Sequence, residues 1–413
     1  MEQRLAFKRP APIVPAFWLF LFRMCGRGEG WGWPGGGVMC RDSRDSRGRV
    51  RGARGFTGRL LCWYRENARD LPWRRSVEDP YRVWVSEIML QQTRVEAVIP
   101  YYERFIRSFP TLDALASATR EDVLRHWQGL GYYRRAHLLH EGVRWMLRER
   151  GGRYPRSRDE WRLVPGVGDY TAGAMASICY GEPVGAVDGN VRRVFARWFA
   201  WETPLDRGPG MVRLSRAARL FAGWSGDPGA WNQAVMELGA RVCVPARPRC
   251  GECPVRVYCR GERSGNPAAF SRVRKRALPV RHAMWVWAPL TEEGWWVRRR
   301  SVSGLWAGLW EFPGTPCEEG CAKWSLAWSR FQGEAAPRAT VAEVNMGEEF
   351  QHRLTHREYG FRPVFLRLTG APRVEAGAAT RLVGDEELMA LPMSVPQQRI
   401  RAWARVCAEA STA

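Results

Sequence analysis

Apolar and polar residues follow two different periods along the chain, and the period changes near residue 280. From about residue 58 to residue 200, apolar residues recur every three or four positions, as Val83, Trp84 and Ile88 do, which is typical of amphipathic helices. The ranges 114–127 and 136–148 predict two further helices, separated by a glycine-containing break. This part of the chain is therefore predicted to be mainly helical.

Beyond residue 280 the pattern changes to short β-type runs that are rich in tryptophan and valine. These runs cover residues 283–287, 295–297 and 361–368, and helical periodicity returns at 385–391 and 396–408. No segment repeats within the chain. The order of strands and helices predicts an α+β domain that follows the helical one.

The chain has 413 residues, which is enough for two or three domains. The polar, arginine-rich segment 261–279 has no periodic apolar face and is predicted to link the two domains. We therefore expect a mainly α N-terminal domain over residues 58–260 and an α+β C-terminal domain over residues 280–405.

The first 57 residues are rich in glycine and arginine, and residues 1–60 carry 12 Lys and Arg against 4 Asp and Glu. The longest uncharged apolar run, residues 10–22, is too short for a membrane span, which needs about 20 residues, and no small-residue cleavage site follows it. We interpret residues 1–57 as a flexible basic extension, or as translated sequence upstream of the real start, and we expect no membrane segment.

The whole chain has 64 Lys and Arg residues against 42 Asp and Glu, and its formal net charge is +22. Hydrophobic residues make up 45% of it, which is a globular composition and excludes a wholly disordered chain. The positive balance indicates a polyanionic partner, and a basic surface without a specific ligand is the alternative. Lysine occurs only at positions 8, 275 and 323, so nearly all the basic residues are arginines.

Four of the 11 cysteines lie close together in the sequence. They form the run C-x6-C-x2-C-x5-C, in which thiolates can converge on one metal centre. Disulfides, a structural zinc ion and an iron–sulfur cluster are the alternatives, and zinc comes second because zinc sites usually consist of two separated close pairs. The other cysteines are scattered, as expected of thiols in a reducing compartment. The four clustered residues are Cys243, Cys250, Cys253 and Cys259.

The segment 164–172 begins with the turn Val164-Pro165-Gly166-Val167-Gly168, between two helical stretches. Because Gly166 and Gly168 lack a Cβ atom, the backbone can approach a phosphate closely, and amide groups at the start of the next helix can point toward it. This arrangement predicts a helix–hairpin–helix anchor for the DNA backbone, and an ordinary helix–helix turn is the alternative. The positive charge favours the anchor, which fixes position on DNA without reading its sequence.

Several short strings, in this order along the chain, are similar to those of one enzyme family. They are Leu71-Pro72-Trp73-Arg74, Ser86-Glu87-Ile88-Met89-Leu90-Gln91-Gln92-Thr93, Gly129-Leu130-Gly131-Tyr132-Tyr133-Arg134, the hairpin, Val187-Asp188-Gly189-Asn190-Val191 and the four cysteines. On these motifs, residues 58–260 resemble the adenine DNA glycosylases of the MutY type, with a weaker continuation to about residue 405. The resemblance implies a helix–hairpin–helix glycosylase domain, a [4Fe-4S] cluster held by the four cysteines, and a Nudix-like C-terminal domain.

Glu87 lies on a predicted helix between Val85 and Ile88, where an apolar pocket would raise the pKa of its carboxyl group and keep it protonated near neutral pH. A surface glutamate is the common alternative. The resemblance implies that Glu87 is the general acid that protonates adenine at N7. It also implies that Asp188 is a second carboxylate, facing the positive charge that develops on the sugar, and Asp188 equally suits the N-cap of the helix that follows it.

Position 170 separates two related kinds of enzyme. The endonuclease III type carries there a lysine that forms a Schiff base and leads to strand cleavage, whereas this chain has Tyr170. No lysine occurs between Lys8 and Lys275, so a lysine Schiff base within the helical domain is excluded. We therefore predict a monofunctional glycosylase that leaves an abasic site. The resemblance implies that Tyr170 and Asn190 help to position the water and the catalytic carboxylates.

The resemblance also assigns residues to DNA contact, because extruding the target base leaves a gap in the duplex that must be filled. Gln92 and Tyr132 are the wedge residues, and Thr93 and Leu130 lie beside the opposing lesion. An ordinary aromatic core residue is the alternative for Tyr132. The residues that correspond to the adenine pocket are Trp73, Arg74, Leu90, Val95 and Gln233.

The segment 304–314 looks like the opening of a Nudix-type fold. Nothing after Gly314 fits the box G-x5-E-x7-R-E-x2-E-E-x-G that a hydrolytic Nudix enzyme needs, so we expect no catalysis in this domain. The resemblance implies that the domain recognises 8-oxoguanine opposite the target adenine, through a segment that reads Phe-Ser-His in the family and Leu354-Thr355-His356 here. Thr355 keeps the hydroxyl group and Leu354 loses the aromatic contact, and ordinary strand residues are the alternative for Thr355 and His356.

We therefore expect a monomeric, cytoplasmic enzyme of bacterial type that binds duplex DNA and removes adenine mispaired with 8-oxoguanine or guanine. Three alternatives remain open: an endonuclease III-like glycosylase/lyase, an iron–sulfur DNA-binding protein without catalysis, and a nucleotide hydrolase. Tyr170 and the extra C-terminal domain disfavour the first, the pair of Glu87 and Asp188 disfavours the second, and the missing Nudix box disfavours the third.

Overall fold

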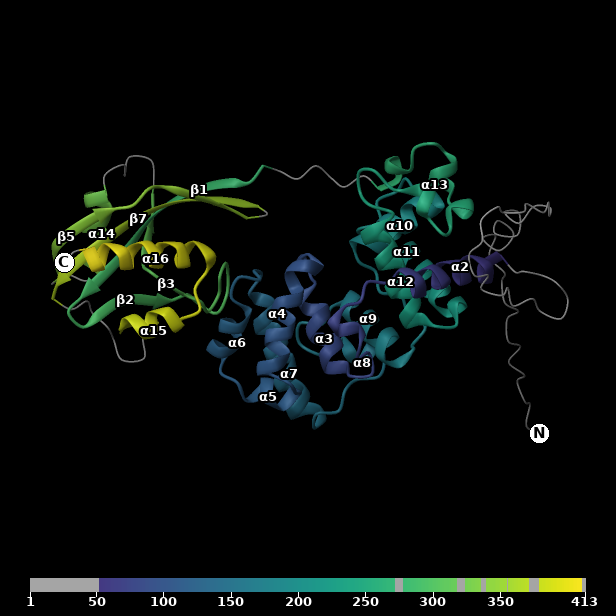
Figure 1. Cartoon of the computed structure of the whole chain (residues 1–413), viewed down its shortest axis with the longest axis horizontal. Coiled ribbons are helices and arrows are strands. Elements are labelled where there is room, and N and C mark those ends of the chain that lie inside the picture. The colour runs from purple at the N-terminus through teal and green to yellow at the C-terminus, as the bar shows by residue number, and fades with distance from the viewer. Residues whose placement is uncertain are drawn as a thin grey trace, which may run out of the picture.

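The computed structural model describes residues 52–271, 278–317, 324–335, 339–354, 356–370 and 379–410. In the described part up to Ser271, every regular element is a helix, as the apolar periodicity predicts (Figure 1). The α-helices are α2 (Gly52–Asn67), α3 (Pro80–Met89), α4 (Val95–Ser108), α5 (Leu112–Ser117), α6 (Arg120–Trp127), α7 (Arg134–Arg150), α8 (Arg158–Trp161), α9 (Asp169–Tyr180), α10 (Gly189–Phe199), α11 (Gly208–Ser225), α12 (Pro228–Arg241) and α13 (Arg260–Arg263). The 3-10 turns are η1 (Pro72–Arg74), η2 (Cys250–Glu252), η3 (Arg256–Tyr258) and η4 (Pro267–Ser271).

Helix α2 begins earlier than the domain boundary expected at residue 58. It starts at Gly52 and buries Phe56 in a core of the helical domain. The rest of the predicted basic extension, residues 1–51, lies outside the described residues.

The helix expected over residues 114–127 is split into α5 and α6. The hydroxyl group of Thr119 accepts a hydrogen bond from the backbone N–H of Asp122, so Thr119 caps a new helix. The helix expected at 136–148 is confirmed as α7. Among the described helices, none is both long and apolar enough to cross a membrane.

Two cores divide the helical domain into two lobes. One core gathers α3 to α9 around Trp84, Trp127 and Trp161, and the other gathers α2 and α10 to α12 around Trp198 and Trp231. Helix α9 of the first lobe packs against α12 of the second. The lobes therefore meet along the two helices that flank the site described below.

The segment between the two domains is shorter than the linker expected at 261–279. Helix α13 and turn η4 pack against α10, and a Cβ atom on Gly261 would lie 2.7 Å from the carbonyl oxygen of Arg197. The chain thus belongs to the helical domain as far as Ser271, and residues 272–277 lie outside the described part.

The C-terminal domain contains one mixed sheet, whose main strand order is β3-β2-β1-β7-β5 (Figure 1). Strands β1 and β7 pair in parallel, and the other strands pair antiparallel. The strands are β1 (Val280–Thr291), β2 (Gly294–Arg299), β3 (Trp310–Glu311), β4 (Gly314–Pro316), β5 (Thr340–Met346), β6 (Phe350–Arg353), β7 (Arg357–Thr369) and β8 (Thr380–Val383). The helices are α14 (Trp324–Ala335), α15 (Asp385–Ala390) and α16 (Val395–Ala410).

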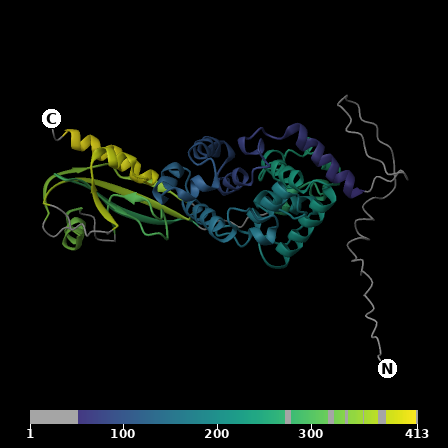
Figure 2. The same cartoon turned by 90° about the horizontal axis from the view of Figure 1, so that it is seen from below.

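The tryptophan-rich first strand supplies both faces of the sheet. Val286 and Ala288 belong to the core under α16, whereas Trp285 and Trp287 belong to the core under α14. This division follows from the alternation of side chains along a strand. Figure 2 shows α14 and α16 on opposite faces of the sheet, so the predicted α+β architecture is confirmed.

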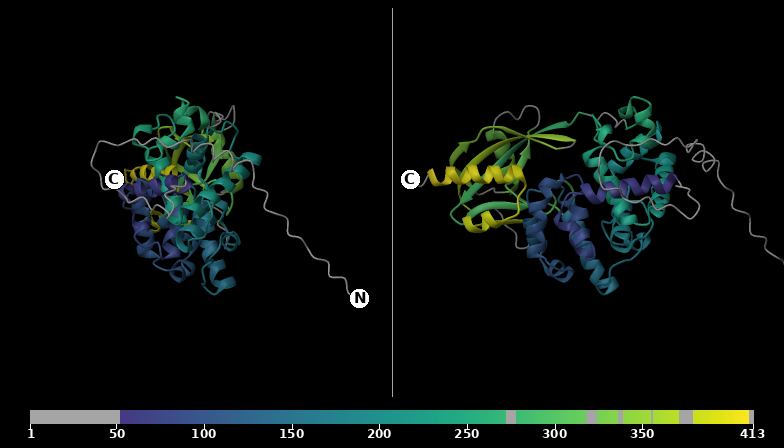
Figure 3. Two further views of the ribbon diagram at one scale, coloured as in Figure 1. Left: turned by 90° about the vertical axis from the view of Figure 1, so that its right-hand side faces the viewer. Right: turned by 45° about the vertical axis from the view of Figure 1, so that its right-hand side comes forward.

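The helical and sheet domains are in direct contact, and Figure 3 shows them side by side. Leu309, in the loop before β3, is fully buried in the first core of the helical domain. On the helical side, the polar groups of this interface come from α6, from Gln128 directly after it, and from α7. Four hydrogen bonds described at this interface join Trp310 Nε1 to Glu121 Oε2 at 3.1 Å, Met393 N to Gln128 Oε1 at 3.1 Å, Arg125 Nε to the carbonyl oxygen of Ala390 at 2.9 Å, and His137 Nε2 to the carbonyl oxygen of Ala307 at 2.8 Å.

Candidate active site

Glu87 lies on the buried face of α3, a helix that begins after the N-cap Asp79. It is 6% exposed, and its Oε2 accepts a hydrogen bond of 2.7 Å from the hydroxyl group of Tyr170. Burial raises the pKa of Glu87 to about 7, and the hydrogen bond from Tyr170 offsets only part of that rise. The carboxyl group can therefore hold a proton near neutral pH and donate it to a bound base.

Asp188 comes from the other lobe, at the start of α10. Its carboxylate oxygens accept hydrogen bonds from the backbone N–H of Val191 at 2.7 Å and from the side-chain amide of Asn190 at 2.8 Å, so it caps the helix. Burial raises the pKa of Asp188, and these hydrogen bonds oppose the rise. The charge of Asp188 acts on both Glu87 and Tyr170, which places the two carboxyl groups in one site.

Tyr170 stands in the first turn of α9, directly after the hairpin. Besides its bond to Glu87, its hydroxyl group contacts Met236 Sδ on α12 at 3.2 Å. Burial and the neighbouring carboxylates raise the pKa of Tyr170 well above its ordinary value, so the phenol keeps its proton. The four residues predicted to be catalytic, Glu87, Tyr170, Asp188 and Asn190, therefore lie together where the two lobes meet.

Glu237 is a further buried carboxylate of this region, and it belongs to none of the motifs in the sequence. It accepts hydrogen bonds from Arg69 Nε at 2.7 Å and from Arg74 Nη2 at 2.9 Å. Burial alone would raise the pKa of Glu237, but the two arginines outweigh it and the pKa is lowered. Glu237 thereby fixes Arg74, and its one signal in the sequence is an acidic residue on the apolar face of α12.

Contacts through Tyr64 join two of the residues predicted to line the adenine pocket, Arg74 and Gln233. The Arg74 guanidinium lies over the ring of Tyr64 at 5.4 Å, and the hydroxyl group of Tyr64 donates to Gln233 Oε1 at 3.2 Å. Trp73, next to Arg74, is buried edge-on against Tyr102. The remaining two, Leu90 and Val95, are partly buried against the same core as Trp73.

The predicted wedge residues lie in the loops that follow α3 and α6. Gln92 is exposed and Tyr132 is 46% exposed, and both have left-handed backbones, with φ of 59° and 49°. Thr93 is partly buried, and its hydroxyl oxygen accepts a hydrogen bond from Arg135. Leu130, in the same loop as Tyr132, is 6% exposed and packs in the first core, and its place beside the opposing lesion stays a prediction.

The hairpin turns sharply between α8 and α9. Gly166 has φ of +78°, and a Cβ atom there would lie 2.5 Å from the Cβ atom of Leu138, so the turn requires glycine. Gly168 has an ordinary backbone and is the N-cap of α9, where no side chain caps the first amide groups. Both glycines are exposed, and free amide groups at an exposed helix start fit an anchor for phosphate.

The four clustered cysteines line one cavity beside α10, together with three arginines. All four are thiols without a disulfide partner in the described residues, and Cys243 Sγ accepts a hydrogen bond of 3.4 Å from Arg197. No group of three His, Cys, Asp or Glu side chains in the described part is arranged to hold a single metal ion. Four thiolates around one cavity, next to positive charge, are a donor set that fits an anionic iron–sulfur cluster.

The segment predicted to recognise 8-oxoguanine lies at the turn between β6 and β7. The backbone N–H of Leu354 donates to the carbonyl oxygen of Arg357 at 2.7 Å and closes the turn. His356 is exposed, and its carbonyl oxygen accepts from the backbone N–H of Val280 at 3.1 Å. Thr355 lies outside the described residues.

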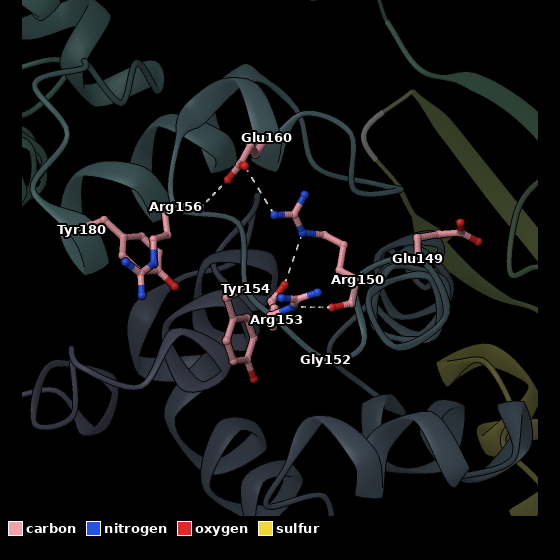
Figure 4. Close-up of a pocket in the computed structure, with 8 residues that line it drawn as sticks. All are labelled: Glu149, Arg150, Gly152, Arg153, Tyr154, Arg156, Glu160 and Tyr180. Carbon is pink, nitrogen blue, oxygen red and sulfur yellow. Dashed lines mark hydrogen bonds and ion pairs between the residues drawn. The ribbon is translucent and has the colours of Figure 1, made fainter.

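A hollow with a volume of about 690 Å³ lies apart from this site, at the carboxyl ends of α7 and α9 (Figure 4). In it Arg150 pairs with Glu160 at 3.4 Å. No residue predicted for catalysis or DNA contact lines it, because Tyr170 and the hairpin lie at the opposite end of α9. Its arginines and tyrosines are Arg150, Arg153, Arg156, Tyr154 and Tyr180.

Comparison with known proteins gives matches over both domains. Residues 85–209 match the HhH-GPD superfamily of base excision DNA repair proteins, and residues 284–403 match the NUDIX domain. The chain is 37% identical to the adenine DNA glycosylase of Homo sapiens over 410 residues, which cover 84% of this chain and 73% of that protein.

Two further matches are more limited in coverage. The adenine DNA glycosylase of Arabidopsis thaliana is 35% identical over 363 residues, which cover 75% of this chain and 57% of that protein. A solved structure of a thermostable thymine-DNA glycosylase is 26% identical, with a TM-score of 0.47, and the match covers 51% of this chain and 97% of that one.

Proposed function

Because this chain belongs to the family of the adenine DNA glycosylases, we propose that it hydrolyses the N-glycosidic bond of adenine mispaired with 8-oxoguanine or guanine in duplex DNA. Adenine glycosylase activity follows from the family, and the choice of mispair is our proposal. The observation that carries the proposed chemistry is the buried Glu87, which holds a proton near neutral pH beside Tyr170 and Asp188.

Glu87 donates its proton to N7 of the extruded adenine. The bond between C1′ of the sugar and N9 then breaks, and its electron pair leaves with the neutral base. The negative charge of Asp188 lowers the energy of the positive charge that develops on the sugar. A water adds to C1′ and releases one proton, which restores the proton on Glu87, so an abasic site and free adenine are the products.

We propose that the enzyme is monofunctional and does not cut the strand. Strand cleavage of the endonuclease III kind needs an amine that forms a Schiff base with C1′. Position 170 holds tyrosine, and no lysine occurs between Lys8 and Lys275. The phenol of Tyr170 keeps its proton and orients Glu87, and it offers no amine.

We propose that the four cysteines hold a [4Fe-4S] cluster. Cys243, Cys250, Cys253 and Cys259 would ligate its irons, and Arg197 would hydrogen-bond to a ligand sulfur, as it does to Cys243 Sγ at 3.4 Å. When bound, the cluster supplies a fixed crosslink among these loops. The chain's own contribution is to hold the loop 243–259 against α10, through bonds from Arg197 to the carbonyl oxygens of Val244 and Pro245.

The partner is duplex DNA, in agreement with the net charge of +22. We propose that the hairpin glycines contact its backbone, that Gln92 and Tyr132 enter the stack, and that Thr355 and His356 read 8-oxoguanine. We also propose that the protein acts as a monomer in the cytoplasm of a cell of bacterial type.

One gel assay tests the activity. The protein is incubated with an end-labelled duplex that contains one 8-oxoguanine·adenine pair, and each sample is split into an alkali-treated lane and an untreated lane. We expect strand cleavage only after alkali, because the strand stays intact at an abasic site until alkali cleaves it. Cleavage without alkali would indicate the glycosylase/lyase alternative, and an intact strand in both lanes would leave only DNA binding.

A further inference from the structure

Arg135 is a buried arginine in the first turn of α7, and it is 7% exposed. Its guanidinium carbon lies 5.5 Å from the ring centre of Trp127 and 5.4 Å from that of Tyr132. No carboxylate pairs with it in the described part of the chain, so its partners are neutral oxygen atoms and aromatic rings. Burying an unpaired cation is costly, and such an arrangement persists only where many hydrogen bonds satisfy the charge.

The guanidinium donates to three segments at once. Nη1 donates to the carbonyl oxygens of Ile88 at 2.9 Å and Met89 at 2.7 Å, which are the free carbonyls at the end of α3. It also donates to the carbonyl oxygen of Gln91 at 2.6 Å. Nη2 donates to Thr93 Oγ1 at 3.1 Å and to the carbonyl oxygen of Gly131 at 3.1 Å, and Nε donates to the carbonyl oxygen of Tyr132 at 3.4 Å.

These acceptors bracket the two strained residues of the site. The bond to Gln91 lies directly before Gln92, and the bonds to Gly131 and Tyr132 lie on both sides of the Tyr132 backbone. Left-handed backbones of residues other than glycine cost free energy and persist only where the surroundings fix them. Arg135 therefore holds the backbones of both exposed residues, Gln92 and Tyr132, in their left-handed conformations.

The same guanidinium also contacts the helix that carries Glu87, the proposed acid. Ile88 and Met89 follow Glu87 directly on α3, so the cation that holds the two loops also fixes the end of the helix that carries the proton donor. A positive charge at this end of a helix is favourable as well, because it faces the negative end of the helix dipole.

We propose that Arg135 is a positioning residue that locks the loop 90–93, the loop 128–132 and the end of α3 into one unit, so that entry of Gln92 and Tyr132 into the duplex places the extruded base at Glu87. The inference rests on the proposed function, because it assigns to Arg135 the geometry of base extrusion. Arg135 does not touch the reacting atoms.

Arg144 provides a matched control on the same helix. It also donates to backbone carbonyls, of Ala116 at 3.0 Å and Ala118 at 2.9 Å, but these lie at the carboxyl end of α5 and directly after it, away from both loops. If Arg135 served only to tie α7 to its neighbours, Arg135→Met and Arg144→Met would have the same kind of effect.

The experiment measures extrusion and chemistry separately in the full-length protein. Extrusion is followed by the fluorescence of 2-aminopurine placed next to the target adenine, in the Glu87→Gln background that binds without releasing the base. Adenine release is followed under single-turnover conditions in proteins with Glu87 intact, and thermal unfolding reports folding. We expect Arg135→Met to reduce both the fluorescence rise and the release rate, the latter by about 10- to 100-fold, with the pH midpoint of release unchanged.

Arg144→Met should lower only the unfolding temperature and leave extrusion and release at the parent level. If Arg135→Met does not fold, Arg135→Lys replaces it, because lysine keeps the charge but cannot reach all three segments. Parent-level extrusion and release by either Arg135 variant would overturn the proposal. Extrusion by the Glu87→Gln protein without any adenine release by the parent protein would overturn the proposed function alone, since the fluorescence comparison still tests Arg135.

Discussion

Two buried glutamates, one in each domain, have nearly the same exposure and very different partners. Glu87 of the helical domain is 6% exposed, and its hydrogen-bond donor in the described part of the chain is the phenol of Tyr170. Glu311 of the sheet domain is 5% exposed and accepts from Arg298 at 2.9 Å and Arg300 at 2.7 Å. A buried carboxylate between two guanidinium groups is a structural anion, whereas one that meets a phenol can keep its proton.

The helical domain contains both kinds of buried carboxyl group. The pKa of Glu87 is raised to about 7 by burial, while the pKa of Glu237 is lowered, because Arg69 and Arg74 outweigh the burial that acts on it too. Burial alone therefore does not identify an acid catalyst. The hydrogen-bond donor identifies it: a phenol beside Glu87 and two guanidinium groups beside Glu237. Substitutions of these residues test this distinction.

The largest effect is expected for Glu87→Gln. Glutamine keeps the size of the side chain and can still accept the hydrogen bond from Tyr170, but it carries no proton for N7. Single-turnover adenine release should fall at least about 1,000-fold, while binding to the mismatched duplex in a filter assay stays close to that of the parent. Release at the parent rate would reject Glu87 as the acid.

The same residue makes rate and stability depend on pH in the same direction. Because the acid works in its protonated form, release should be fastest below about pH 7 and fall roughly tenfold per pH unit above it. In the folded protein the pKa of Glu87 is raised from 4.5 to about 7, so its contribution to stability is fully present below pH 4.5 and is lost as pH rises to about 7. Glutamine has no carboxyl group to ionise. In denaturant unfolding, the stability of the Glu87→Gln variant should therefore rise relative to that of the parent between pH 4.5 and about 7.

The second largest effect is expected for Glu237→Gln, which leaves Arg69 and Arg74 without a buried counter-charge. We expect a loss of about 3 kcal/mol in the free energy of unfolding, because breaking a buried ion pair leaves uncompensated charge. Glu149→Gln is the control, since its partner Arg148 is 66% exposed on the side chain and the pair is worth little. Equal unfolding curves for the two variants would contradict the assignment of Glu237 as a structural anion.

Much of the fold could be predicted from the sequence, because it depends on local periodicity. The helix at 136–148 and the strands at 283–287, 295–297 and 361–368 are all present in the structure, with longer boundaries. The division of residues 114–127 into two helices depends on the hydrogen bond that the Thr119 hydroxyl group accepts from the backbone N–H of Asp122, and apolar spacing does not contain that information. The packing of residues 261–271 onto α10 could not be predicted either, because it depends on the close approach of Gly261 to the backbone of Arg197 and not on a periodic apolar pattern.

Only those residues of the site that belong to short sequence motifs could be predicted from the sequence. The chemistry of Glu87, Asp188 and Tyr170 could be named from the sequence, but their meeting across two lobes, with 101 positions between the carboxylates, could not. Glu237 and Arg135 were missed because their roles come from partners distant in sequence. Only the tertiary structure distinguishes such residues from the many other charged residues of a strongly basic chain.

A third, smaller effect is expected for Tyr170→Phe. The phenol of Tyr170 donates to Glu87, whereas arginines donate to Glu311. The hydrogen bond from Tyr170 lowers the pKa of Glu87, so its removal in Tyr170→Phe should raise that pKa further. The alkaline limb of the pH–rate profile should therefore move to higher pH. Tyr180→Phe, at the other end of α9, should leave the limb in place, and a downward shift in Tyr170→Phe would contradict the geometry.

The smallest effect is expected at the interface between the domains, where Gln128→Ala removes the acceptor for the backbone N–H of Met393. One lost hydrogen bond to the backbone costs about 1 kcal/mol, so the unfolding free energy should fall by about that amount. Gln398→Ala is the matched control, because Gln398 donates to the carbonyl oxygen of the same Met393 at 2.9 Å from within the sheet domain.

Gln128→Ala breaks a contact between the two domains, whereas Gln398→Ala breaks a contact within the sheet domain. The two variants therefore also test whether the contact between the domains affects the reaction. Gln128 directly follows α6 and is the first residue of the loop 128–132, which carries Tyr132, so the loss of its contact should also reduce the preference for 8-oxoguanine over guanine opposite adenine. Gln398→Ala should cost similar stability without changing that preference. If both variants kept the parent ratio of release rates on the two duplexes, the interface would be a passive contact, and the sheet domain would act on the site only through the DNA that both domains bind.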